Sequence, residues 1–333
     1  MRILIDIVHP ADVNFYQKAI GELGKKHEIV LTVLGRGRLV DIVKKEYPKL
    51  KVIPLGKHRK GKIGKLLGLI DREIRFILLF LGKRFDRVSS FGWYPAIAAK
   101  LFGIKSVLFY DDYEYKINFN MCKIFSDRFI IPKSIPATGK NIKKYKGFKE
   151  LAYLKDFKPN SISKRYSVKP NKYVFVRDVA PISLNYQDSK YKDFSELFYY
   201  LRKKGYEILY YPENKALGKK YHRLCKVLEG PVEDILSLIY YAKFVISSGD
   251  TIARESALLG TPTLYTTNRD MKVNKQLIQL KAIVKTTDIY EIEHIMKNFL
   301  KNDSKPQLRD KIKSHIKNNW QDTTAVIIKE ILN

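Results

Sequence analysis

A short polar stretch in the second half of the chain has the composition of a phosphate-binding turn. It follows an apolar strand signal over 244–247 and begins a helix, and its residues are Ser248, Gly249, Asp250 and Thr251. Such a turn places backbone N–H groups and the positive end of a helix dipole where a phosphate can bind. Glu255, one helical turn later, lies within reach of a ribose hydroxyl. This pattern predicts a nucleotide site; an ordinary strand-to-helix connection with a solvated Glu255 is the alternative.

Arg177 ends the strand predicted over 173–176, so we expect it at the same sheet edge as this turn. The planar fork of a guanidinium group is suited to pyrophosphate. Arg177 is therefore a candidate diphosphate ligand. The alternative is a structural salt bridge with an acid such as Asp178.

Two groups capable of acid–base chemistry follow the first predicted strand, residues 3–8. His9 comes directly after the strand, and Asp12 falls where the next helix begins. A histidine at this place can act as a general base because its pKa lies near neutrality. The alternative is a histidine held by hydrogen bonds for structural reasons.

Three carboxylates, Asp111, Asp112 and Glu114, follow another buried strand, over 106–110. Carboxylates at the end of a strand could position a sugar, act as acid and base, or hold a divalent cation. Helix caps and solvated loop charges are the competing explanation.

Gly92, Trp93 and Tyr94 end the strand predicted over 87–90. Gly92 permits close approach of the backbone, and either aromatic ring could stack on a sugar or a lipid. Equally, the two rings fit the description of core residues at the start of a helix.

The elements that must position these residues alternate between strand and helix signals. In the first half we predict strands over 3–8, 27–33, 51–54, 87–90, 106–110 and 128–131, and helices over 13–23, 39–46, 63–81 and 95–102. In the second half we predict strands over 173–176, 207–211, 244–247 and 263–265, and helices over 194–203, 219–228, 232–241 and around Glu255. This alternation indicates an α/β protein with two doubly wound Rossmann-type domains and a C-terminal helical tail.

The domain boundary is predicted in a polar stretch. Residues 156–170 would link an N-terminal domain, 1–155, to a C-terminal domain, 171–333, whose last helix could pack back on the first domain. Two such domains place a cleft between the carboxyl ends of their strands, where ligands bind in folds of this type.

Charge is the most unusual property of the composition. The 333 residues include 63 Lys and Arg against 34 Asp and Glu, which gives a net charge of +29. Such a field attracts nucleic acid, anionic lipid or phosphorylated small molecules. No recognisable nucleic-acid motif accompanies the charge, so nucleic acid is the least favoured partner. Residues 57–84 join a basic loop to an apolar helix, which favours contact with a membrane surface over a buried helix with basic ends.

Other composition features exclude several classes of protein. Two distant cysteines indicate no disulfide framework, and the six histidines show no metal-ligand spacing, so we expect no metal site. The first strand is too short and too acidic for a signal peptide, and no apolar run reaches the length of a membrane span. These observations predict a cytoplasmic protein.

Several motifs occur in the same order in the DUF354 family, which this chain resembles over nearly its whole length. They are His9–Ala11, Phe91–Gly92, Phe109–Asp112, Gly147–Leu154 and Glu255–Pro262. That family is largely archaeal and is similar to the GT-B glycosyltransferases and to the non-hydrolysing UDP-N-acetylglucosamine 2-epimerases. The sequence departs from the family pattern at Asp12 and Asn14, where the family usually has histidines, and at Asp178, where it has an apolar residue.

The resemblance implies roles for individual residues. Glu255 matches the glutamate that holds the nucleotide ribose, and 248–251 match the loop that takes the diphosphate. His9 matches a base of the transferases, and Asp111 or Asp112 falls near an acid of the epimerases. The implied activity is a GT-B glycosyltransferase, without a metal or other cofactor, that uses a UDP-sugar (an N-acetylhexosamine donor) and an acceptor that could be lipid-linked. A UDP-N-acetylhexosamine 2-epimerase and a non-catalytic polyanion or nucleic-acid binder are the alternatives.

Overall fold

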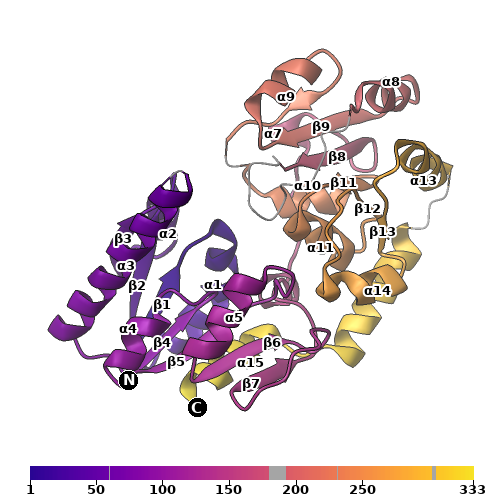
Figure 1. The fold of residues 1–333 in the computed structure, drawn as a ribbon. Coiled ribbons are helices and arrows are strands. Elements are labelled where there is room, and N and C mark those ends of the chain that lie inside the picture. Colours follow the sequence, from indigo (N-terminus) through magenta and orange to yellow (C-terminus); the bar gives the residue numbers. More distant parts are fainter. Residues whose placement is uncertain (60, 180–192, 231, 302–304) are drawn as a thin grey trace. The chain divides into compact units, whose positions relative to one another are not determined.

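The chain folds into two compact units. The computed structural model describes the chain except for residues 60, 180–192, 231 and 302–304 (Figure 1). Unit 1 consists of Met1–Lys155 together with Trp320–Asn333, and unit 2 of Asp156–Asn319. Each unit is built around one parallel sheet, as the alternation of strand and helix signals predicts.

Unit 1 contains a seven-stranded parallel sheet in the order β3-β2-β1-β4-β5-β6-β7. Its strands are β1 (Arg2–Ile7), β2 (Glu28–Gly35), β3 (Lys51–Lys57), β4 (Arg87–Ser90), β5 (Lys105–Phe109), β6 (Arg128–Pro132) and β7 (Ile142–Tyr145). Its helices are α1 (Pro10–Leu23), α2 (Leu39–Glu46), α3 (Lys62–Gly82), α4 (Ala96–Leu101), α5 (Lys116–Phe125), α6 (Leu151–Leu154) and α15 (Thr323–Leu332). The central strands are buried on both faces, which explains why their sequences are mostly apolar.

Unit 2 contains a six-stranded sheet in the order β10-β9-β8-β11-β12-β13. Its strands are β8 (Tyr173–Asp178), β9 (Glu207–Pro212), β10 (Lys226–Val227), β11 (Val245–Ser247), β12 (Thr263–Tyr265) and β13 (Ile283–Lys285). Its α-helices are α7 (Ser163–Tyr166), α8 (Ser195–Lys203), α9 (Lys215–Tyr221), α10 (Ile235–Tyr241), α11 (Asp250–Leu258), α12 (Lys275–Gln279), α13 (Ile289–Lys301) and α14 (Lys305–Asn319), and a short 3-10 turn η2 spans Lys272–Asn274.

Most predicted elements are present, and one helix is wrong. Instead of a helix over 219–228, α9 ends at Tyr221 and β10 follows, pairing Lys226 with Leu209 and Val227 with Tyr210. A strand of two residues carries no period of its own, so the helical pattern before it could be extended through it. The helices α5, α6 and α7 and the edge strands β7 and β13 were not predicted.

The boundary between the two units differs from the predicted division of the chain into an N-terminal and a C-terminal domain. Residues 156–170, which we expected to link the domains, belong to unit 2, where Ile162 and Val168 are buried in a core cluster. The last helix, α15, contacts α1 and α6 of unit 1. Among the described residues, no helix combines the length and apolar character needed to cross a bilayer.

Candidate functional site

Strand order brings three of the predicted motifs of unit 1 to one edge of its sheet. β4 pairs with both β1 and β5, and all three strands run parallel. Their carboxyl ends are therefore neighbours, and the residues that follow them are His9, Gly92 and Asp111. The point where strand order reverses, here beside β1, is where ligands bind in doubly wound sheets.

His9 and Asp12 form a reciprocal cap at the start of α1. The Asp12 carboxylate accepts hydrogen bonds from the backbone N–H groups of Val8, at 3.0 Å, and His9, at 2.8 Å. His9 Nδ1 accepts from the N–H of Ala11 at 3.2 Å. In a neutral imidazole an acceptor at one nitrogen requires the proton on the other, so His9 presents Nε2–H. In this arrangement His9 is a hydrogen-bond donor at Nε2, and its role as a general base stays a prediction.

Asp12 has the basicity that His9 lacks in this tautomer. Burial raises the pKa of the Asp12 carboxyl to about 7, against the lowering effect of its two backbone hydrogen bonds and of the Lys149 charge. Asp12 is 4% exposed. A carboxyl group that titrates near neutrality is matched to proton transfer at neutral pH.

The carboxylates after β5 are engaged with the protein. Lys149 Nζ lies 3.4 Å from the Asp111 carboxylate, and both side chains are largely buried. Asp112 accepts a hydrogen bond from the backbone N–H of Tyr115 at 3.1 Å, at the start of α5. Glu114, in the same turn, is half-buried. Asp112 therefore closes the turn that precedes α5, and Asp111 pairs with the Lys149 ammonium group at the sheet edge.

The aromatic residues after β4 pack within the unit. Trp93 is only 6% exposed, donates from Nε1 to Asn118 Oδ1 at 3.2 Å, and stacks on Tyr94. Tyr94 in turn lies against the Arg72 guanidinium. Gly92 has φ +143°, which an L side chain rarely adopts. Trp93 is thus a core residue at the start of a helix, whereas Tyr94 is only partly buried, and the contact of these rings with a ligand stays a prediction.

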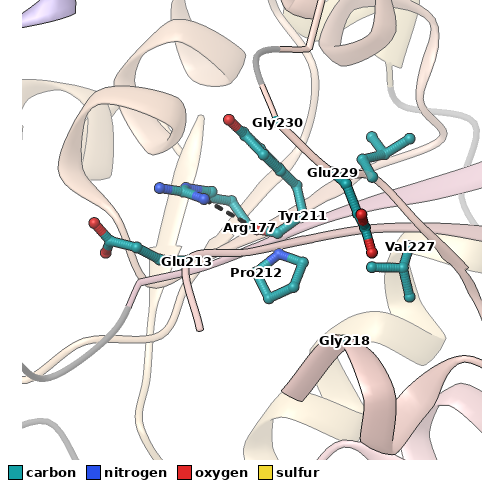
Figure 2. Close-up of a pocket in the computed structure, with 9 residues that line it drawn as sticks. Arg177, Tyr211, Pro212, Glu213, Gly218, Val227, Glu229 and Gly230 are labelled. Carbon is teal, nitrogen blue, oxygen red and sulfur yellow. Dashed lines mark hydrogen bonds between the residues drawn. The ribbon is translucent and has the colours of Figure 1, made fainter. Parts of the chain in front are cut away.

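In unit 2, Arg177 borders a pocket of about 340 Å³ at the carboxyl end of the sheet (Figure 2). The Arg177 guanidinium donates to the Tyr211 carbonyl at 3.2 Å and stacks over the Tyr211 ring at 4.5 Å. The residues lining the pocket are Arg177, Tyr211, Pro212, Glu213, Gly218, Val227, Leu228, Glu229 and Gly230. No salt bridge joins Arg177 to Asp178 among the described residues, because Asp178 instead accepts from Tyr210 and Ser248.

Hydrogen bonds of Ser247 and Ser248 hold the turn between β11 and α11 in place. Ser248 Oγ accepts from the Val179 N–H at 2.7 Å and donates to Asp178, which ties the turn to the end of β8. Gly249 caps α11, and its N–H donates to Ser247 Oγ at 3.1 Å. A Cβ on Gly249 would lie 2.7 Å from Val179 Cγ2. The turn therefore requires glycine because of close packing, while the first N–H groups of α11 face the sheet edge.

Asp250 has a structural partner that the sequence did not reveal. Its carboxylate accepts from the Tyr265 hydroxyl and forms an ion pair with Arg269. The Asp250 side chain is therefore engaged within unit 2, and the diphosphate role of residues 248–251, which concerns their backbone N–H groups, stays a prediction. Thr251 is half-buried in the first turn of α11, and Glu255 is buried one turn later, at 4% exposure.

Three residues of these sheet edges were missed as site candidates. Lys149 was noticed only as part of a family motif, although it lies against Asp111 and over the Phe91 ring. Tyr211 ends β9 beside Arg177, and a Tyr at the end of an apolar strand is a signal that could have been used. Arg269 follows β12 in a polar loop, and no spacing in the sequence relates it to Asp250.

The comparisons with known proteins agree on the fold. A family model described as "Protein of unknown function (DUF354)" matches residues 1–333. A similar sequence is an uncharacterized protein of Methanocaldococcus jannaschii, 25% identical over 305 residues, which is 86% of this chain and 88% of that protein.

Solved structures of similar fold are enzymes. UDP-N-acetylglucosamine 2-epimerase from Rickettsia bellii matches with a TM-score of 0.75 at 14% identity, covering 100% of this chain and 96% of that chain. The M. jannaschii UDP-GlcNAc 2-epimerase in complex with UDP-GlcNAc and UDP has a TM-score of 0.68 at 14% identity, with 99% of each chain covered. MurG of Acinetobacter baumannii has a TM-score of 0.59 at 12% identity, covering 100% and 99%. These matches confirm the predicted pair of Rossmann-like domains of the GT-B type.

Proposed function

The chain belongs to the DUF354 family, and from this premise we propose that it is a glycosyltransferase that moves an N-acetylhexosamine from a UDP-sugar to an acceptor hydroxyl. The proposal rests most on one observation: Arg177, the pocket beside it and the amino end of α11 all lie at the carboxyl edge of one parallel sheet. That edge offers a cation, an open pocket and backbone N–H groups together.

Each part of this edge has a role in holding the donor. The pocket accommodates the nucleobase against the Tyr211 ring, because a flat π-surface favours stacking. Arg177 and the first N–H groups of α11 stabilise the diphosphate as the bond from the sugar breaks. Glu255 fixes the ribose. Ser248 positions the turn through its bonds to Val179 and Asp178 and does not itself bind the donor.

Unit 1 supplies the proton chemistry in this proposal. The acceptor oxygen attacks the anomeric carbon, the bond to the diphosphate breaks, and Asp12 takes the hydroxyl proton. His9 donates a hydrogen bond from Nε2–H to a bound hydroxyl or anion. Lys149 pairs with Asp111, which serves as a polar contact for the acceptor sugar. A weak base is sufficient because a hydroxyl becomes strongly acidic only as it attacks.

Nucleotide binding tests the donor half of the proposal. Calorimetry with UDP and UDP-N-acetylglucosamine should show selective binding, and Glu255→Ala should weaken it by about 10–100-fold through the loss of charged hydrogen bonds. Glu233→Ala is the matched control, because Glu233 pairs with Arg165 at the exposed surface of the same unit. Absence of nucleotide binding, with tight and salt-sensitive binding of nucleic acid instead, would establish a non-catalytic polyanion binder.

A second candidate, a UDP-N-acetylhexosamine 2-epimerase, is favoured by the higher TM-scores of the epimerases and by the carboxylates after β5. Against it, Asp111 and Asp112 are held by Lys149 and by a backbone N–H, which makes them poor bases for a sugar C–H. Incubation with the UDP-sugar in deuterated water separates the two. Deuterium at C2 without an acceptor would identify the epimerase, whereas UDP release only with an acceptor identifies the transferase.

A further inference from the structure

The helix α3 exposes an apolar stripe to solvent. Seven large side chains, each between 49% and 76% exposed, are Ile63, Leu66, Leu67, Ile70, Ile74, Leu78 and Leu81. They recur at intervals of three and four residues, so they share one face of the helix. The stripe extends over about 27 Å at 1.5 Å per residue. In Figure 1, α3 runs along the outer margin of unit 1.

The opposite face of α3 is fixed to the unit. Arg72 is buried, pairs with Asp6 at 2.7 Å and donates to the Leu55 carbonyl at 3.1 Å. Phe76 and Phe80, four and eight residues further on, lie in a core cluster with residues of β1, β2 and α4. These contacts prevent the helix from rotating, so the stripe stays outward.

Positive charge accompanies the stripe. Residues 57–84 contain nine Lys and Arg against two acidic residues. Lys57, Arg59 and Lys65 are exposed at the amino end of α3, and Arg84 is exposed after its carboxyl end. The acid nearest the stripe, Asp71, is neutralised by Arg75 at 3.0 Å. Lys60, also predicted to be part of this basic loop, lies outside the described residues.

A second observation shows that cations gather at the amino end of α3. Burial first, and then the positive charges of Arg36 and Lys65, lower the pKa of His58. Arg36 comes from the loop after β2, and the His58 N–H donates to the Gly35 carbonyl at 2.9 Å. Residues from two loops therefore concentrate positive charge beside the first turn of the stripe.

We infer that this face of α3 is a docking surface for an anionic lipid bilayer. The Ile and Leu side chains enter the boundary between headgroups and acyl chains, while the flanking Lys and Arg side chains bind lipid phosphates. A protein partner fits less well, because protein interfaces are enriched in aromatic residues and depleted in Lys, whereas the stripe is purely aliphatic and flanked by lysines. The inference does not depend on the proposed enzymatic activity.

Vesicle flotation with the full chain tests the inference. We expect the protein to float with vesicles of equal parts phosphatidylcholine and phosphatidylglycerol at physiological salt and to bind phosphatidylcholine vesicles far more weakly. Leu66→Ser/Ile70→Ser should reduce the partition coefficient by about tenfold or more. Ile117→Ser/Ile124→Ser on α5 is the control, because these side chains are equally exposed in the same unit.

The charges are tested by a second pair of variants. Arg59→Gln/Lys65→Gln should reduce binding by about fivefold for each charge removed, whereas Lys143→Gln/Lys144→Gln on β7 should reduce it less. Thermal unfolding is measured on every variant, which shows that the fold is intact without relying on the nucleotide binding of the proposed function.

Three results would overturn the inference. They are the absence of the wild-type protein from the floated vesicles, an equal loss in the α5 control, and a wild-type dimer in light scattering that Leu66→Ser/Ile70→Ser converts to a monomer without any change in vesicle binding. The last result would identify the stripe as a contact between two copies of the chain.

Discussion

The two units have the same strand order, but opposite chemistry at the edges of their sheets. In unit 1, β1 is followed by His9 and Asp12, and β5 is followed by Asp111. In unit 2, β8 ends at Arg177, and β11 leads into the N–H groups of α11. Each unit thus has an equivalent site at the carboxyl edge of its sheet. The residues at the strand ends determine whether that site suits proton transfer or anion binding.

The central strands differ in the same sense. β1 carries a buried acidic residue, Asp6, which pairs with Arg72 of α3. The corresponding strand β8 is buried through Val174, Phe175 and Val176 and places its Arg177 at the end. Unit 1 therefore uses an ion pair inside the core to fix a helix, whereas unit 2 keeps its cation available at the edge.

The largest expected effect comes from removing the base at the edge of unit 1. Asp12→Asn should lower kcat by about 10²–10⁴-fold, because the amide can still accept the cap hydrogen bonds but cannot take a proton. In the wild type, kcat/KM should rise with pH through an apparent pKa of about 7. Steady-state assays of UDP release across pH 5–9 measure both. An unchanged pH profile in Asp12→Asn would show that another residue is the general base.

The same variant should be more stable than the wild type at alkaline pH. A carboxyl whose folded pKa is raised contributes its stability below its unfolded pKa, and that contribution is lost as pH rises toward about 7. Thermal unfolding should therefore show that the unfolding free energy of Asp12→Asn, relative to that of the wild type, rises between pH 4 and pH 7 by on the order of 1–3 kcal/mol.

The comparison of the central strands is tested by Arg72→Met. Leaving Asp6 buried without its partner should cost about 3–5 kcal/mol of unfolding free energy. Arg75→Met on the same helix removes an exposed pair with Asp71 and should cost less than about 0.5 kcal/mol. Denaturant titration compares the two, and equal losses would show that the buried pair does not fix α3.

The turn of unit 2 is tested by Gly249→Ala. The new Cβ would lie 2.7 Å from Val179 Cγ2, so the turn must shift and destabilise the fold by about 1–3 kcal/mol. UDP affinity should fall by about tenfold, because the N–H groups of α11 move with the turn. Gly21→Ala, where nothing lies within 4 Å of the added carbon, should leave affinity unchanged and slightly stabilise α1.

The smallest effect is expected from Lys149→Met. Because the Lys149 charge lowers the pKa of Asp12, its removal should move the acid limb of the pH profile to higher pH, by less than about one unit. Lys155→Met breaks an exposed pair with Asp322 and is the control. A shift to lower pH would mean that Lys149 acts on some other group.

The sequence was sufficient for the parts of this molecule that local patterns determine. Alternating apolar strands and helices predicted both sheets, and the position of a residue after a strand predicted its place at the sheet edge, as for His9 and Arg177. These residues then lie near one another because the strands of a parallel sheet all have their carboxyl ends at the same edge.

Contacts between distant residues could not be predicted in this way. Lys149 meets Asp111 across 38 positions, and Arg269 meets Asp250 across 19. Neither pair has a spacing that a helix or strand would impose. Only the folded structure therefore shows which carboxylates are paired with a cationic side chain. The tautomer of His9 likewise depends on one backbone N–H that no sequence pattern reports.

The last segment of the chain carries a consequence for biosynthesis. Trp320 packs against Phe148, Thr323 donates to the Phe148 carbonyl, and Ile327 and Ile331 are fully buried in α15. Residues 1–155 therefore emerge from the ribosome long before α15, the helix that completes their core, has been translated. We expect unit 2 to be the first to become resistant to protease on the nascent chain, although it is encoded second, and unit 1 to follow only once α15 has left the ribosome.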